Sequence, residues 1–182
     1  MKIKKFADLI SGSPNLTEAK ATSVGDVSAT SIVVGSVSYE GHFIGHDTGF
    51  NGIHNKFIDL TFADLTSGKT FTTTTDNAEG VFSFVAEEEH VYQLSRIHYQ
   101  TSGQYAHDVG GPLSSIYFDA TSGVNNLGHL NWLLESNPNS PGTVVQEPSF
   151  KSVKDYFKSA RPNSEWNAFE WHEVSVRTEK SQ

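Results

Sequence analysis

Within residues 55–85, the side chains from Ile58 to Ala63 alternate with a period of two, and this pattern constrains the fold most strongly. Successive side chains of a β-strand point to opposite faces, so a strand with this pattern is buried on one side only. One face of the first strand would carry Ile58, Leu60 and Phe62, and the other Asp59, Thr61 and Ala63. Ser67 and Gly68 then supply a turn. The pattern therefore predicts β-structure over this segment.

The second half of this segment, "FTTTTDNAEGVFSFV", predicts two strands joined by a turn. Its four consecutive threonines are stiff at the first side-chain torsion and favour a strand with one wet face. The residues from Asp76 to Gly80 are typical of a turn, in which glycine tolerates positive φ. Phe82 and Phe84 would then point into the interior. Turn chemistry and core packing explain every residue here, so we interpret the stretch as architecture and not as a chemical site.

Similar patterns recur along the chain. Residues 31–39 predict a strand with Val33, Val37 and Tyr39 on one face and Ile32 and Val34 on the other, and residues 127–135 predict one with Leu130, Trp132 and Leu134 on one face. Residues 91–99 and 115–119 are further candidates. About seven short strands with no helical periodicity between them favour an all-β fold, an antiparallel β-sandwich covering residues 28–135.

The two ends of the chain depart from this pattern. Residues 1–27 predict a short helix followed by a linker, and residues 136–182 predict a C-terminal extension. The extension would begin with a polar linker, continue as a helix from Phe150 that ends at Arg161-Pro162, and finish as a strand from Asn167 to Arg177. An amphipathic helix usually covers a core, so we expect the extension to pack on the sandwich. Residues 105–112, "YAHDVGGP", are interpreted as a long turn.

The order of these motifs resembles the carboxypeptidase regulatory-like (prealbumin-like) β-sandwich family. The resemblance covers residues 31–99, and the matching positions are Gly35, Val37, Ile58 to Phe62, Thr73 to Asp76, Gly80, Phe82 to Phe84 and Tyr92 to Leu94. It implies a prealbumin-like sandwich in an exported bacterial protein or lipoprotein. It also implies a non-catalytic extracytoplasmic module that binds protein or carbohydrate or serves as a spacer. The family's known activities are not implied by these motifs.

Charge and cysteine content exclude several classes of function. The formal net charge of −8 opposes binding to nucleic acid, which requires clustered Lys or Arg. The chain has no cysteine, which excludes disulfides, thiolate metal ligands and thiol nucleophiles. No apolar run is long enough for a transmembrane segment or for a signal peptide behind "MKIKKF". For an exported protein, we therefore expect a leader or a lipid-attachment cysteine upstream of this sequence.

The Gly-rich segment between residues 41 and 59 carries the strongest candidate for chemistry. Its candidate metal ligands are His42, His46, His54 and Asp47, with Asp59 at its end. Imidazoles and carboxylates are ligands of zinc or iron. Glycines oppose a helix here, and on an extended strand residues four apart are roughly 13 Å apart, too far for one ion. We therefore favour an exposed loop with no cofactor, and the alternative is a metal-dependent enzyme or metalloprotein that holds a divalent metal in this loop.

The same segment contains candidate binding residues. Phe43, Phe50 and Ile53 are apolar side chains in a loop that we expect to be exposed, and loops at one end of a sandwich are a common place for recognition. They would form either a small satellite core or a surface for a protein or carbohydrate ligand. Nucleophilic catalysis finds little support, because Ser114 and Ser115 lack a Gly-x-Ser-x-Gly motif. The sequence therefore predicts a protein that is not an enzyme.

Overall fold

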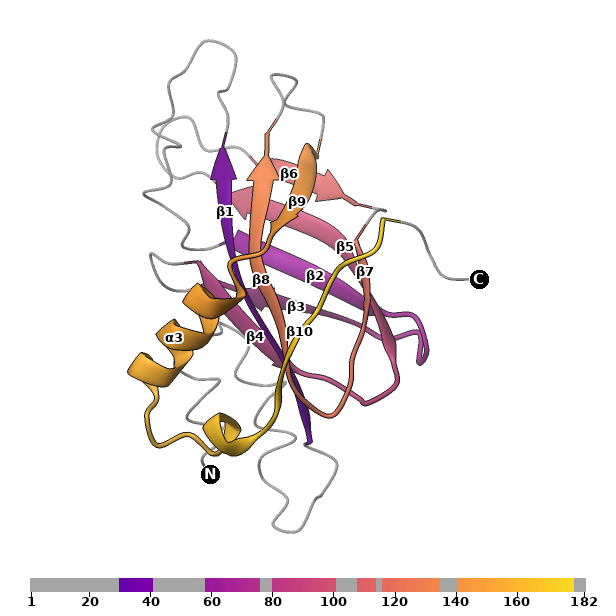
Figure 1. The fold of residues 1–182 in the computed structure, drawn as a ribbon. Coiled ribbons are helices and arrows are strands. Elements are labelled where there is room, and N and C mark those ends of the chain that lie inside the picture. The colour runs from indigo at the N-terminus through magenta and orange to yellow at the C-terminus, as the bar shows by residue number, and fades with distance from the viewer. Residues whose placement is uncertain are drawn as a thin grey trace.

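The computed structural model describes residues 30–40, 58–75, 80–100, 108–113, 116–134 and 141–178. Within these residues it contains ten β-strands, one α-helix and one 3-10 helix (Figure 1), which confirms the all-β prediction. The strands are β1 (Ser31–Glu40), β2 (Ile58–Asp64), β3 (Thr70–Thr74), β4 (Val81–Val85), β5 (Val91–Gln100), β6 (Asp108–Pro112), β7 (Tyr117–Asp119), β8 (Gly123–Leu133), β9 (Thr143–Glu147) and β10 (Trp171–Glu173). The helices are α3 (Phe150–Ala160) and η1 (Glu165–Ala168).

The strands form two sheets that pack face to face. Sheet 1 has the order β4-β1-β8, with β9 and β10 sharing the outer edge of β8. Sheet 2 has the order β3-β2-β5, with β6 and β7 sharing the outer edge of β5. Most pairings are antiparallel, as predicted, but β8 pairs in parallel with both β1 and β10. Parallel neighbours need a long connection instead of a hairpin, and β1 and β8 lie far apart in the chain.

A core of aromatic and aliphatic side chains fills the space between the sheets. Phe62 lies near its centre, and its ring centroid is 4.7 Å from that of Phe84 and 5.9 Å from that of Phe82. The strand faces expected from the sequence are confirmed, because the following residues are all buried in this cluster: Val33, Val37, Tyr39, Ile58, Leu60, Phe62, Phe82, Phe84, Leu130 and Trp132. Each such side chain contributes roughly 1.5–3 kcal/mol when fully buried. This core therefore holds the two sheets together.

A second core lies on the other face of sheet 1, under the helices. Ile32 and Val34 of β1 point to this face, as predicted, and pack with Val153 and Phe157 of α3 and with Trp166 of η1. Val153 and Phe157 are four residues apart, so they share one face of the helix. Figure 1 shows α3 lying against sheet 1, with sheet 2 behind it. The predicted C-terminal helix is therefore confirmed, and it adds a third layer to the sandwich.

Two segments interpreted as turn or linker are strands. Residues 108–112 form β6, which pairs with β5, and Thr143–Glu147 form β9, which pairs with β8. The turn and linker interpretations of these residues are therefore wrong. Glycines and prolines in or beside both segments make the strands hard to predict from the sequence, because these residues have low intrinsic β-propensity. Pairing with a long neighbouring strand decides their conformation.

The final strand is shorter than the sequence indicates. Only Trp171–Glu173 pair as a strand, in parallel with β8. The chain then crosses to sheet 2, where the backbone groups of Arg177 exchange two hydrogen bonds with those of Tyr117, at 2.9 and 2.7 Å. We call residues 171–177 the C-terminal strap. A straight strand in one sheet could not make both sets of contacts.

The side chains of the C-terminal strap and of Phe169, which follows η1, divide between the two cores. Trp171 packs against the core under the helices, as does Phe169 just before the strap. Val174 and Val176 pack against the core between the sheets. Among the described residues, no helix combines the length and apolarity needed to span a membrane.

A buried carboxylate fastens two turns of sheet 2. Asp64 accepts hydrogen bonds from the N–H groups of Thr66 and Ser67, both at 3.0 Å, and contacts Nδ1 of His90 at 2.8 Å. Burial alone would raise the pKa of Asp64, but the hydrogen bonds from His90 and the turn outweigh it and hold the pKa below its ordinary value. The ionised form therefore stabilises the fold.

Replacing Asp64 by asparagine should lower the free energy of unfolding by about 1–3 kcal/mol at pH 7, because hydrogen bonds to a charged group are lost. A carboxyl group with a depressed pKa stabilises the protein above its ordinary pKa of about 3.9, and this contribution is lost as the pH falls below that value. Urea unfolding at several pH values should therefore show wild type and variant converging as the pH falls from about 4 through the depressed pKa of Asp64. A difference that stays constant over this range would contradict the assignment.

Candidate functional site

A β-bulge in β8 places one histidine on the outer face of sheet 1. Val34 of β1 pairs with Asn126 of β8, and the next pair is Ser36 with His129. Two steps along β1 therefore correspond to three along β8, so β8 contains one extra residue. Gly128 lies in this bulge with φ of +65°, a conformation that side chains with a Cβ rarely adopt. If β8 alternated regularly past Leu127, with no bulge, the side chain of His129 would point into the core between the sheets.

The imidazole of His129 is held between two serines of β1. Its Nδ1 lies 2.7 Å from Oγ of Ser36, and its Nε2 lies 2.7 Å from Oγ of Ser38. In a neutral imidazole one nitrogen donates and the other accepts, and a hydroxyl can do either. Ser36 is only 7% exposed, whereas His129 is partly exposed. The two hydroxyls therefore fix the orientation of a ring that solvent can reach.

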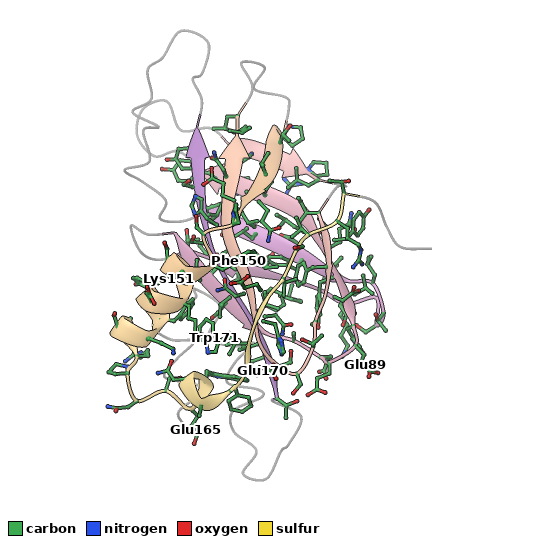
Figure 2. The ribbon with its side chains drawn as sticks, in the orientation of Figure 1. Glu89, Phe150, Lys151, Glu165, Glu170 and Trp171 are labelled. Atoms are coloured by element: carbon green, nitrogen blue, oxygen red, sulfur yellow. The ribbon has the colours of Figure 1, made fainter. Side chains whose placement is uncertain are left out.

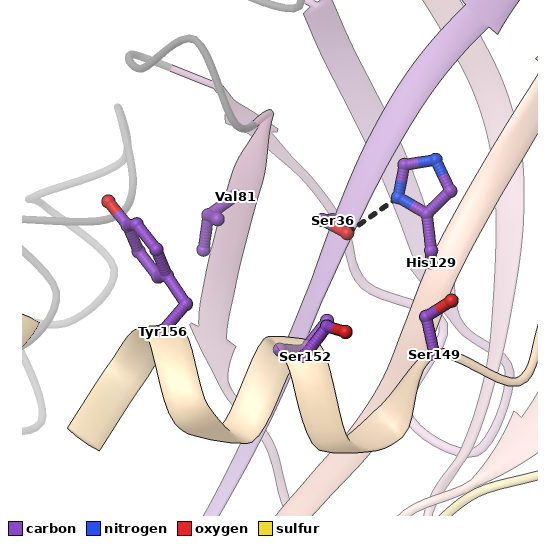
Figure 3. A pocket seen from close by; sticks show the side chains of 7 residues that line it. Ser36, Val81, His129, Ser149, Ser152 and Tyr156 are labelled. Atoms are coloured by element: carbon purple, nitrogen blue, oxygen red, sulfur yellow. Dashed lines mark hydrogen bonds between the residues drawn. The ribbon is translucent and has the colours of Figure 1, made fainter. Parts of the chain in front are cut away.

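A hollow of about 300 Å³ lies between this histidine and α3. Its lining comes from β1, β4, β8 and the first half of the helix: Ser36, Val81, His129, Ser149, Ser152, Val153 and Tyr156. Figure 3 shows the side chains of α3 facing those of the strands across this space. None of the described residues that line it carries a carboxylate, an ammonium or a guanidinium group. We call it the serine–histidine hollow.

The start of α3 leaves one more hydroxyl at the serine–histidine hollow. Ser149 is the N-cap residue, but its side chain makes no capping hydrogen bond. A serine at this position usually accepts a hydrogen bond from the first turn. Asn126 fixes this end of the helix instead, because its Nδ2 donates to the carbonyl of Phe150 at 2.8 Å. The Ser149 hydroxyl is thus not used as a cap.

A second hollow, of about 290 Å³, lies on the opposite side of α3, beside β10. It is lined by Asn126, Phe150, Lys151, Lys154, Trp171, His172 and Glu173, of which Figure 2 labels Phe150, Lys151 and Trp171. Its cationic groups have partners within the protein: Lys151 pairs with Asp155, and Nζ of Lys154 lies 5.8 Å from the ring centroid of Trp171. We take the serine–histidine hollow as the candidate site, because the Ser149 hydroxyl there is not used as a cap.

The sequence candidates lie mostly outside the described residues. This holds for the candidate metal ligands His42, His46, His54 and Asp47, for the candidate binding residues Phe43, Phe50 and Ile53, and for Ser114 and Ser115. Asp59 is described: its carboxylate accepts a hydrogen bond from Thr74, and Oδ2 lies 3.5 Å from Nδ1 of His98. Within the described ranges, no three His, Asp or Glu side chains are grouped closely enough to hold a metal ion.

The residues of the serine–histidine hollow were not candidates in the sequence. They come from four parts of the chain separated by many residues, and only the topology of the fold brings them together. One local signal was present, since a glycine inside a strand pattern often marks a bulge, and Gly128 directly precedes His129.

Comparison of the chain with protein-family models, with curated proteins and with solved structures finds no match. The resemblance to the carboxypeptidase regulatory-like family therefore stays a prediction from the sequence. The site has to be interpreted from its own chemistry.

The contact between Ser36 and His129 has the distance of a nucleophile and its base, but its surroundings suit recognition better. In a catalytic triad, a carboxylate orients the imidazole and stabilises its charged form. Here the second ring nitrogen contacts the hydroxyl of Ser38, which cannot supply that charge. The low exposure of Ser36 also keeps its hydroxyl from a substrate. Of the lining hydroxyls, those of Ser149 and Ser152 can donate and accept hydrogen bonds to a bound molecule.

Replacing Gly128 by alanine should disturb this site and lower the free energy of unfolding by more than the backbone cost alone. A non-glycine residue in this conformation costs about 1–2 kcal/mol. The new Cβ would also lie 3.0 Å from the carbonyl oxygen of Glu147 and 3.2 Å from the ring of Phe150. Gly68 is a matched control, because its φ is +77° and nothing lies within 4 Å of a Cβ there.

Urea unfolding of Gly128→Ala and Gly68→Ala measures the difference between the two positions. We expect the larger loss of stability at Gly128, together with altered NMR signals of the His129 ring. Equal losses, with an unchanged ring signal, would show that the bulge does not position His129.

Proposed function

We propose that this chain is a non-catalytic binding module, part of an exported protein or lipoprotein, that binds a protein or carbohydrate ligand outside the cytoplasm. The observation that carries the proposal is the serine–histidine hollow, in which neutral hydroxyls and one oriented imidazole line a cavity beside α3. Groups of this kind bind through hydrogen bonds in both directions. One imidazole without a carboxylate among the described lining residues is neither a full set of metal ligands nor a catalytic triad.

The position of the serine–histidine hollow supports a binding role. Its walls are strands of sheet 1 and a helix whose Val153 and Phe157 are anchored in a core, so the lining groups rest on regular elements. A site on rigid elements binds with little loss of conformational entropy. The extracytoplasmic location and an upstream lipid anchor rest on the family resemblance of residues 31–99 alone.

A binding screen tests this proposal. The labelled protein is applied to an array of immobilised glycans and to fractionated cell-surface proteins, beside a His129→Ala/Ser152→Ala variant. We expect a ligand that wild type retains, that the variant loses, and that is recovered chemically unchanged. Conversion of the ligand to a product by wild type would contradict a non-catalytic role, and equal binding by the variant would contradict the site.

The alternative is a metal-dependent enzyme or metalloprotein that uses the segment from His42 to Asp59. The contact between Asp59 and His98 favours it, because it brings one further potential ligand, His98, to the end of that segment. Elemental analysis of the purified protein and of a His42→Ala/His46→Ala/His54→Ala variant separates the two proposals. We expect no stoichiometric metal in either sample. Stoichiometric metal in wild type that is lost in the variant would favour the alternative.

A further inference from the structure

The polar groups of the serine–histidine hollow share one chemical property. Ser36, Ser149, Ser152, Tyr156 and His129 carry hydroxyls or an imidazole, which can each donate and accept a hydrogen bond. An anion requires donors and usually a cation, and a cation requires carboxylates. The described lining has neither. A ligand whose own groups both donate and accept, such as a sugar hydroxyl, matches this lining best.

The apolar groups of the serine–histidine hollow are placed apart from the imidazole. Figure 3 shows Tyr156 and Val81 toward one end of the hollow and His129 with Ser149 toward the other. A pyranose ring presents C–H groups on its faces and hydroxyls around its edge, so it needs an apolar contact and polar contacts in the same site. The ring of Tyr156 supplies a large apolar surface at small conformational cost. The apolar end of the hollow would therefore contact a face of the sugar ring, and the polar end would contact the hydroxyls at its edge.

Size and charge restrict the ligand further. A volume of about 300 Å³ is at the lower end of small-molecule pockets, which span roughly 300–1,000 Å³. It suits one sugar ring better than several. The net charge of −8 also disfavours acidic sugars, because the field of the whole protein repels anions.

We infer that the serine–histidine hollow binds a single neutral sugar ring, through the hydroxyls of Ser149 and Ser152 and the ring of Tyr156, beside the wall that His129 forms. This inference rests on the proposed function and names the ligand class of that same site. Ser36 is a positioning residue: its buried hydroxyl holds the imidazole of His129 from beneath. Both ring nitrogens of His129 contact serine hydroxyls, so the imidazole is a fixed part of the wall of the hollow.

Ligand-observed NMR titration of the full chain tests the inference with defined probes. The neutral probes are the methyl pyranosides of glucose, galactose, mannose and N-acetylglucosamine, and the charged probes are glucuronate and glucosamine. We expect at least one neutral glycoside to bind more tightly than either charged sugar. Ser152→Ala and Tyr156→Ala should each weaken that binding roughly fivefold or more, the effect of losing a net hydrogen bond or an aromatic contact.

Ser159→Ala is the matched control, because Ser159 is an exposed serine of α3 that does not line the serine–histidine hollow. We expect it to bind the neutral glycoside as wild type does. Ser36→Ala should weaken binding and also shift the pH dependence of the His129 ring signals, which a residue that only touches the ligand would leave unchanged.

The outcomes separate this inference from the proposed function. Preferential binding of glucuronate or glucosamine, no binding of any neutral glycoside, or equal effects of Ser152→Ala and Ser159→Ala would each overturn the inference. If a protein ligand in the binding screen is nevertheless lost in the His129→Ala/Ser152→Ala variant, the proposed function stands with another ligand class. If neither experiment finds a ligand, both fail.

Discussion

Replacing Phe62 by alanine should lower the free energy of unfolding by about 3–5 kcal/mol, the usual cost of truncating a buried phenylalanine. Its side chain is fully buried at the centre of the core between the sheets. Its ring centroid lies 4.7 Å from that of Phe84, 6.0 Å from that of Phe71 and 6.2 Å from that of Phe118. The cavity would therefore remove contacts with both sheets at once. Urea unfolding followed by tryptophan fluorescence measures the loss.

Phe71→Ala is the control for this variant. Phe71 lies on β3 and packs against the same core, but it is only partly buried. We expect it to cost clearly less than Phe62→Ala, because less apolar surface is returned to water. Equal losses at the two positions would mean that Phe62 is not central to the core.

Ending the chain after Phe169 should leave the protein at or below the limit of cooperative folding. The truncation removes the C-terminal strap, whose Trp171, Val174 and Val176 each pack against one of the two cores. Losing the burial of three such side chains costs about 3–6 kcal/mol, against a total stability of 5–15 kcal/mol for a typical domain. It also removes the backbone partners of Tyr117 and Asn126. Calorimetry should show a broad, weak transition or none.

Two full-length variants separate burial from charge in the C-terminal strap. Val174→Ser/Val176→Ser keeps the chain length and should reproduce a large part of the loss. Arg177→Ala removes only the ion pair with the exposed Asp119 and should cost about 0–1 kcal/mol. If Arg177→Ala proved as harmful as the truncation, the strap would act through its ion pair and not through burial.

Local pattern was sufficient to predict the strands that carry the core and the helix that covers it. Residues such as Leu60 and Phe84 alternate in register with the pleat of a strand, and Val153 and Phe157 are spaced as on a helix. These signals are local, because each depends only on which residues a few positions apart in the sequence are apolar. The fold class could therefore be predicted before any pairing was known.

Local pattern failed where a long-range partner decides the structure. Val144 and Val145 favour a strand, but Gly142 and Pro148 flank them, and only pairing with β8 shows that they belong to a sheet. Gly110 and Gly111 of β6 have no β-propensity of their own, and β5 imposes their conformation. The parallel pairing of β1 with β8 has no local signature at all.

The candidate site depends entirely on such long-range pairing. Ser36 and His129 are neighbours only because β1 lies beside β8 with a register that the bulge at Gly128 shifts by one residue. Ser152 joins them only because α3 folds back over sheet 1. Gly128 within the strand pattern indicates a bulge, but it does not indicate that the bulge turns His129 toward Ser36 and α3.

The most direct test of the account is a chemical-shift map of the labelled protein with the neutral methyl glycoside that binds most tightly. Binding in the serine–histidine hollow should perturb the signals of His129, Ser152 and Tyr156 and leave those of Trp171 and His172, in the hollow across α3, unchanged. Perturbations that gather around Trp171 and His172, or in residues 41–57, with His129 unaffected would contradict it.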